Sequence, residues 1–121
     1  MYQSLIEYWS KKKNIIFWKK KPTNILKKIK ENRYAWFSDG ELNIYNNCIE
    51  KNLEKSSSKT AAIFVDQNQK IKKLTYYELF KSVENFSKII NSYKKKKLFK
   101  VAIHASASPE SVISMLACCK L

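Results

Sequence analysis

Few side chains in this sequence are of the types that carry out acid–base, nucleophilic or metal chemistry. His104 is the only histidine, and no acid or nucleophile stands at a partner spacing, so a packing or surface role is favoured over proton transfer. Cys118 and Cys119 are adjacent, and no second Cys/His pair has ligand spacing, so they are not a metal motif. Glu110 is expected at a helix start, where a carboxylate complements the helix dipole. We therefore assign no catalytic, cofactor-binding or metal-binding residue.

Gly40 is the only glycine in the chain, and it follows Asp39 in a segment flanked by aromatic residues. An Asp-Gly pair predicts a tight turn, because glycine adopts a positive φ at no steric cost. A loop that cradles phosphates needs glycines for close backbone approach to the ligand. One isolated glycine does not supply such a loop, so these residues are not expected to bind a nucleotide.

Basic residues outnumber acidic ones by 24 to 10, which gives a net charge of +14 and suggests an anionic partner. Arg33 is the only arginine, however, and specific readers of phosphates or bases favour the bidentate arginine fork. Three tryptophans interleaved with lysines are typical of a stacking platform for single strands, although burial explains Trp9 and Trp18. Nucleic-acid binding is therefore unlikely on the sequence, and the lysines are read as solvated.

The composition, with 45% hydrophobic residues, fits one ordinary domain that can bury a core. No run of eighteen apolar residues exists and Met1–Ser10 does not resemble a signal peptide, so we expect no membrane contact. Three cysteines, two of them adjacent, favour reduced thiols and a cytoplasmic location.

Hydrophobic spacing before residue 60 predicts helices separated by lysine-rich or serine-rich loops. Apolar residues recur at helical intervals in three segments, Tyr2–Ser10, Thr23–Lys30 and Tyr45–Leu53. In the last of these, Cys48, Ile49 and Leu53 are expected to face inward.

After residue 60, the pattern changes to strands and longer helices. Ala61–Val65 and Ile71–Leu74 predict a β-hairpin, and Thr75 with Glu78 has the spacing of a capping box for the following helix. That helix is expected to bury Leu79, Val83, Phe86, Ile90 and Tyr93.

A strand over Leu98–His104 is predicted next, followed by a helix that begins at Ser108-Pro109-Glu110. Its apolar side is expected to comprise Val112, Ile113, Met115, Leu116 and Cys119. A strand followed directly by a helix is half of a βαβ unit, which needs a second parallel strand beyond the helix. We therefore expect the chain to be truncated within a larger α/β domain.

Several motifs occur in an order that resembles one enzyme family. These are Trp36-Phe-Ser-Asp-Gly-Glu-Leu-Asn-Ile-Tyr-Asn-Asn-Cys-Ile-Glu50, Thr75-Tyr-Tyr-Glu-Leu79 and Val101-Ala-Ile, followed by Pro109-Glu-Ser-Val-Ile-Ser-Met-Leu-Ala-Cys-Cys-Lys120. This order is similar to the N-terminal region of the acetyl- and propionyl-CoA synthetases, AMP-forming acyl-CoA ligases of the adenylate-forming superfamily.

The resemblance implies an α/β protein whose residues 1–59 form an N-terminal helical and irregular segment and whose residues 60–121 begin the AMP-binding domain. Such ligases join a short carboxylic acid to coenzyme A through an acyl-adenylate, with ATP and Mg²⁺. The family's phosphate loop, adenine site and catalytic lysine would lie beyond Leu121, so the chain alone is expected to bind no cofactor and to be inactive. Its implied partner is the remainder of the ligase, and small-molecule substrates belong to the full enzyme.

The sequence departs from the family pattern at Ser92–Lys97, where glycines are usual, and at His104, where an aromatic residue is common. The alternative interpretation is a small basic module that binds nucleic acid or anionic surfaces through its lysine-rich loops. A module of that kind has no reason to carry the ordered motifs. Acetate cannot be distinguished from propionate, because the acyl pocket is not within these motifs.

Overall fold

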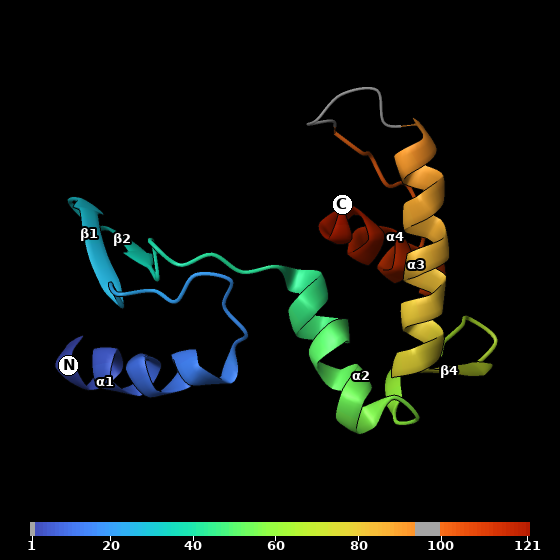
Figure 1. Cartoon of the computed structure of the whole chain (residues 1–121), viewed down its shortest axis with the longest axis horizontal. Coiled ribbons are helices and arrows are strands. Elements are labelled where there is room, and N and C mark those ends of the chain that lie inside the picture. Colours follow the sequence, from blue (N-terminus) through green and yellow to red (C-terminus); the bar gives the residue numbers. More distant parts are fainter. Residues whose placement is uncertain (1, 94–99) are drawn as a thin grey trace. The chain divides into compact units, whose positions relative to one another are not determined.

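The computed structural model describes residues 2–93 and 100–121, and it is a mixture of helices and small antiparallel hairpins, as expected (Figure 1). The chain divides into two compact units, Met1–Asn43 and Ile44–Leu121. Among the helices in the described ranges, none combines the length and apolar character needed to cross a lipid bilayer.

The first unit contains one helix and one hairpin. Helix α1 (Tyr2–Lys12) continues into the 3-10 turn η1 (Lys13–Ile15), and strands β1 (Leu26–Lys30) and β2 (Arg33–Trp36) pair antiparallel.

The helix predicted over Thr23–Lys30 is therefore wrong, since β1 occupies most of that segment. Asn32 adopts φ 58° and closes a two-residue turn, so Lys30 pairs with Arg33. The apolar residues of this segment fit a helical period, but the strand partner immediately downstream decides the structure.

The second unit contains the two longest helices of the described chain. Its elements are η2 (Asn46–Glu50), α2 (Lys51–Ser56), β3 (Thr60–Val65), β4 (Ile71–Thr75), α3 (Tyr76–Tyr93) and α4 (Pro109–Lys120). The predicted hairpin is confirmed, with β3 and β4 antiparallel and Ile63 opposite Lys73. The predicted helix over Tyr45–Leu53 is also present, although its centre, η2, is a π turn.

The capping box at the start of α3 is confirmed. The Glu78 carboxylate accepts hydrogen bonds from the Thr75 amide and hydroxyl, both at 2.8 Å, while the Glu78 amide donates to the Thr75 hydroxyl at 3.2 Å. The reciprocal bonds satisfy backbone donors that would otherwise lack a partner, so they fix where α3 begins. Helix α4 starts similarly, because the Ser108 amide donates to the Ser111 hydroxyl at 3.3 Å.

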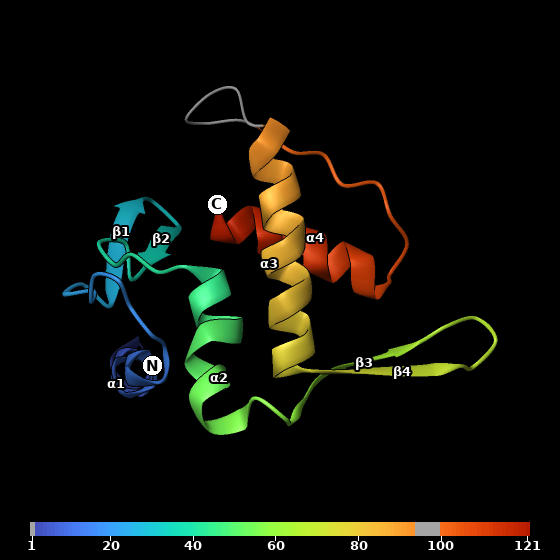
Figure 2. The ribbon, with the colours of Figure 1, turned by 45° about the vertical axis from the view of Figure 1, so that its right-hand side comes forward.

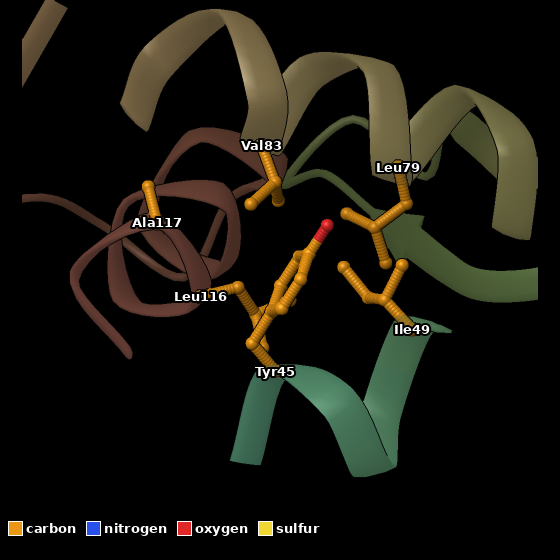
Figure 3. Close-up of a cluster of buried hydrophobic side chains, with 6 residues drawn as sticks. All are labelled: Tyr45, Ile49, Leu79, Val83, Leu116 and Ala117. Atoms are coloured by element: carbon orange, nitrogen blue, oxygen red, sulfur yellow. The ribbon is translucent and has the colours of Figure 1, made fainter. Parts of the chain in front are cut away.

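The core of the second unit lies where α3 and α4 cross beside the helical segment that begins at Tyr45 (Figure 2). Its buried residues come from these three elements and point toward one another (Figure 3): Tyr45, Ile49, Leu79, Val83, Leu116 and Ala117. Three residues expected in the interior are outside it instead. Cys48 is exposed, Tyr93 is 76% exposed at the end of α3, and Met115 is 51% exposed on α4.

The strand predicted over Leu98–His104 is not formed by residues 100–104, which are extended but belong to no sheet, and 98–99 lie outside the described residues. The physical reason is the lack of a partner: an extended segment becomes a strand only when a neighbour completes its hydrogen bonds. Residues 100–108 lead directly into α4, which is the order of elements in the first half of a βαβ unit.

Candidate functional site

The motif from Trp36 to Glu50 begins with a tight turn, as predicted, but the positive φ is not at the glycine. The Gly40 amide donates to the Phe37 carbonyl at 3.0 Å, and Phe37 adopts φ 50°. The prediction that Gly40 is needed for a positive φ is therefore wrong.

Gly40 is needed because Trp18 lies against it. A Cβ at position 40 would be 2.7 Å from Cζ3 of Trp18 and 3.1 Å from Cβ of Pro22. The indole is held in place because its Nε1–H donates to the Lys13 carbonyl at 2.7 Å. Backbone hydrogen bonds between Lys20 and Glu41, at 3.0 and 2.9 Å, bring the two segments together.

Asp39 organises the loop on the other side of this turn. Its carboxylate accepts hydrogen bonds from the Thr23 hydroxyl, from the Thr23 amide at 2.9 Å and from the Asn24 amide at 3.1 Å. The bonds from Thr23, hydroxyl first, hold the pKa of Asp39 far below its ordinary value. The Asp39 carboxylate therefore stays ionised near neutral pH and holds the backbone of Thr23 and Asn24 in place.

A second polar cluster, missed by the sequence reasoning, lies at the edge of the core. The Tyr45 hydroxyl donates to Oε1 of Glu84 at 3.1 Å, and Lys120 forms an ion pair with the same oxygen. The Lys120 ammonium also lies 4.7 Å from the Tyr45 ring centroid. Tyr45 is only 1% exposed, so its hydroxyl needs this partner.

Each member of the Tyr45–Glu84–Lys120 cluster has a shifted pKa. The hydrogen bond from Lys120 lowers the pKa of Glu84, and the same bond raises the pKa of Lys120. Burial, followed by the hydrogen bond to Glu84, raises the pKa of Tyr45. The shifts of Glu84 and Lys120 favour the charged forms of the pair, and the shift of Tyr45 keeps the phenol neutral, as in a structural network.

The residues considered for chemistry do not come together. His104 is exposed in the extended segment before α4, whereas Glu110 lies in the first turn of α4. Cys118 and Cys119 are half-buried, and burial raises the pKa of the Cys118 thiol, which makes it less reactive. Within residues 2–93 and 100–121, no three His, Cys, Asp or Glu side chains gather as metal ligands.

The aromatic residues of the first unit form a chain of ring contacts. Trp9 lies 5.9 Å from Trp36, Trp36 lies 6.2 Å from Phe37, and Phe37 lies 5.5 Å from Trp18, between ring centroids. Such tilted contacts are typical of packing between aromatic rings. Trp9 and Trp36 remain 40% and 38% exposed.

An apolar groove lies in the second unit. Its volume is about 810 Å³, and its walls come from β3, from residues of the segment 101–108 and from α4. A neighbouring cavity of about 570 Å³ shares Val112 and Met115 with it. Together they make one apolar surface, here called the β3–α4 groove, lined in part by Ile63, Val65, Val101, Ile103, Val112 and Met115.

Comparison with known proteins supports the family resemblance along the whole chain. Residues 2–48 match the family described as the acetyl-coenzyme A synthetase N-terminus. The chain is 32% identical over 128 residues to the acetyl-coenzyme A synthetase of Dictyostelium discoideum, covering 100% of this chain and 19% of that protein.

Two bacterial relatives agree. Identity is 33% over 117 residues to the Pasteurella multocida acetyl-coenzyme A synthetase (96% of this chain, 18% of that protein). The chain is 31% identical over 116 residues to the acetyl-coenzyme A synthetase of Cupriavidus metallidurans, which covers 94% of this chain and 18% of that protein. The chain thus spans about a fifth of the length of the curated relatives it matches. It belongs to the acetyl-coenzyme A synthetase family, of whose N-terminal region it carries the sequence.

Proposed function

We propose that this chain is the N-terminal structural segment of an AMP-forming ligase that makes acetyl-CoA from acetate, ATP and coenzyme A, or propionyl-CoA from propionate. The observation that carries the proposal is similarity along the whole chain to one fifth of each acetyl-coenzyme A synthetase. In this proposal residues 60–121 begin the AMP-binding domain, the remainder of the ligase is the partner, and the enzyme is cytoplasmic.

The proposal assigns no ATP, Mg²⁺ or coenzyme A site to the described residues. Gly40 is the only glycine and packs against Trp18, so the chain lacks the run of glycines that a phosphate-cradling loop uses. The Asp39 carboxylate is occupied by three hydrogen bonds from Thr23 and Asn24. No chemical step is therefore assigned to these residues, and their proposed work is to fold and to present the β3–α4 groove.

A domain-replacement experiment tests the proposal. The matched region of the Dictyostelium synthetase is replaced by this chain, and acetate-dependent ATP–pyrophosphate exchange is measured for the hybrid, for the 121-residue chain alone and for the relative without its matched region. We expect exchange by the hybrid only. Purified chain that catalyses exchange by itself, or a shortened relative as active as the hybrid, would contradict the proposal.

A matched pair of variants tests whether the hybrid requires a folded second unit for ATP–pyrophosphate exchange. Ile49 is fully buried, so Ile49→Asp places an unpaired charge in the core and should abolish exchange. Ile89→Asp makes the same change at a side chain that is 54% exposed on α3, and exchange should be retained.

A further inference from the structure

The first unit carries a strip of exposed aromatic side chains. Trp9 of α1 lies 5.3 Å from Tyr8 and 5.9 Å from Trp36 of β2, between ring centroids. Tyr34 stands two positions before Trp36 on β2, so these two side chains lie on one face of the hairpin. The four residues, here called the aromatic strip, each expose between 38% and 52% of their surface. A contiguous apolar surface of this kind marks a binding site.

Lysines border the aromatic strip at both ends. The Lys12 ammonium lies 5.4 Å from the centroid of the Tyr8 ring. Lys28 of β1 is the cross-strand partner of Tyr34, and paired residues point to the same side of a sheet. Both lysines are exposed, so positive charge faces solvent beside the aromatic rings.

Helix α1 has the pattern of a helix that lies at a boundary between water and lipid. Leu5, Tyr8 and Trp9 are exposed and occupy positions i, i+3 and i+4, so they share one face. Lys12 continues that face one turn later, whereas Glu7, the only acidic residue of α1, falls on the opposite side by the helical period. Lysine stems can lie along such an apolar face while their ammonium groups stay in water.

The geometry of the aromatic strip favours lipid over two other occupants. A single-stranded nucleic acid stacks its bases on open ring faces. The rings of Tyr8 and Trp9 meet edge to face at 85°, and Lys12 lies over the Tyr8 ring, so these faces do not form a row of stacking platforms. A second copy would bring a chain of the same net charge, +14, against this one.

We propose that the aromatic strip binds the surface of bilayers that contain anionic phospholipids. Helix α1 lies in the plane of the headgroups, the rings of Trp9 and Trp36 enter the interface, and Lys12 and Lys28 contact lipid phosphates. Attraction to a charged membrane surface is not directional, so lysines serve as well as arginines. The sequence predicts no membrane contact because it lacks a spanning segment and a signal peptide, but a helix that lies along a bilayer surface needs neither.

The test measures binding of the 121-residue chain to vesicles of phosphatidylcholine alone and to vesicles that also contain about 30% phosphatidylserine. Co-sedimentation should show binding at least about tenfold stronger to the anionic vesicles, and added salt should weaken it. Brominated acyl chains in the anionic vesicles should quench the tryptophan fluorescence, since all three tryptophans are in the first unit. Equal binding to both kinds of vesicle, or binding without quenching, overturns the proposal.

A matched pair of variants locates the contact. Tyr8 is 52% exposed with Lys12 over its ring, and Tyr77 of α3 is 53% exposed with the Lys81 ammonium 6.0 Å from its ring centroid. Tyr8→Ala should weaken vesicle binding about fivefold, because apolar area that enters the interface is lost, whereas Tyr77→Ala should leave it unchanged. Lys12→Glu should also weaken it at least about fivefold. Equal effects of the two tyrosine variants contradict the proposal.

Two further measurements address the other occupants. Stronger binding of a uridine oligonucleotide than of anionic vesicles at the same salt concentration overturns the proposal, because the occupant is then a nucleic acid. The hybrid ligase described above is tested on the same vesicles and should bind them. A hybrid that does not bind also overturns it, since the remainder of the ligase then covers the aromatic strip. None of these measurements uses ATP–pyrophosphate exchange, so the result is independent of the proposed function.

Discussion

Substitution of Lys120 by methionine should destabilise the second unit by about 2 kcal/mol. Methionine keeps most of the apolar stem of the side chain but removes the charge that pairs with Glu84 and lies over the Tyr45 ring. Glu84 then keeps its hydrogen bond from Tyr45 but loses its counter-charge while partly buried.

The magnitude follows from the exposure of the two charged side chains, 27% for Lys120 and 24% for Glu84. Fully exposed pairs contribute about 0 to 1 kcal/mol, and removing one partner from a fully buried pair costs about 3 to 5 kcal/mol. A cation over an aromatic ring adds about 0.5 to 1 kcal/mol. An intermediate burial therefore gives about 2 kcal/mol, which corresponds to a fall in Tm of about 8 to 16 °C for a unit of this size.

The assay uses the separation of chromophores between the two units. All three tryptophans, Trp9, Trp18 and Trp36, are in the first unit, whereas the long helices α3 and α4 are in the second. Circular dichroism at the helical band thus reports mainly on the second unit, and tryptophan fluorescence reports on the first. We expect Lys120→Met to lower the midpoint seen by circular dichroism and to leave the fluorescence midpoint unchanged.

A double-mutant cycle with Glu84→Gln separates the pair from its surroundings. The coupling between positions 84 and 120 should be about 1 kcal/mol or more, whereas Lys55→Met, at an exposed lysine of α2, should change the midpoint little. A coupling below about 0.3 kcal/mol would refute the reasoning, because the pair would then behave as a solvated surface contact.

The same cluster gives stability a defined pH window. Glu84 has a lowered pKa, so its contribution is present above its ordinary value of 4.5 and is lost as the pH falls through the folded-state pKa. Lys120 has a raised pKa, so its contribution is present below 10.5 and is lost as the pH rises through the folded-state pKa. The wild-type advantage over Lys120→Met should therefore be largest between these limits.

Three further predictions concern local structure. Gly40→Ala should cost about 1 to 3 kcal/mol, since its Cβ would collide with Trp18, and the tryptophan fluorescence midpoint measures the loss; no change would refute the contact. Thr75→Ala should cost about 1 kcal/mol by removing half of the capping box with Glu78, read from urea unfolding by circular dichroism; an unaltered midpoint would contradict it. Asp39→Asn should reduce the stability of the first unit at neutral pH but not at strongly acidic pH. The pKa of the Asp39 carboxyl is lowered in the folded state, so the stability that the carboxylate contributes is lost as the pH falls through this lowered pKa. Equal losses of stability at both pH values would contradict this prediction.

Elements whose signals are local could be predicted from the sequence. The hairpin, the capping box at Thr75 and the start of α4 at Ser108-Pro109 each depend on residues within a few positions, and all three are present. Leu79 and Val83 follow a simple helical period, and both are buried.

The features that could not be predicted from the sequence depend on residues that are distant along the chain. The cluster of Tyr45, Glu84 and Lys120 joins residues 39 and 36 positions apart, and no spacing rule brings them together. The role of Gly40 depends on Trp18, which approaches from a separate segment. Residues 26–30 form a strand against their helical spacing because β2 follows directly. In each case tertiary contact outweighs the local pattern.

The uncharged edge of β3 has a consequence for how the purified chain behaves in solution. An unpaired strand edge without charge offers its backbone hydrogen-bonding groups to the same edge of another copy. The net charge of +14 opposes that association, and added salt screens the charge, so aggregation of the purified chain should increase with ionic strength.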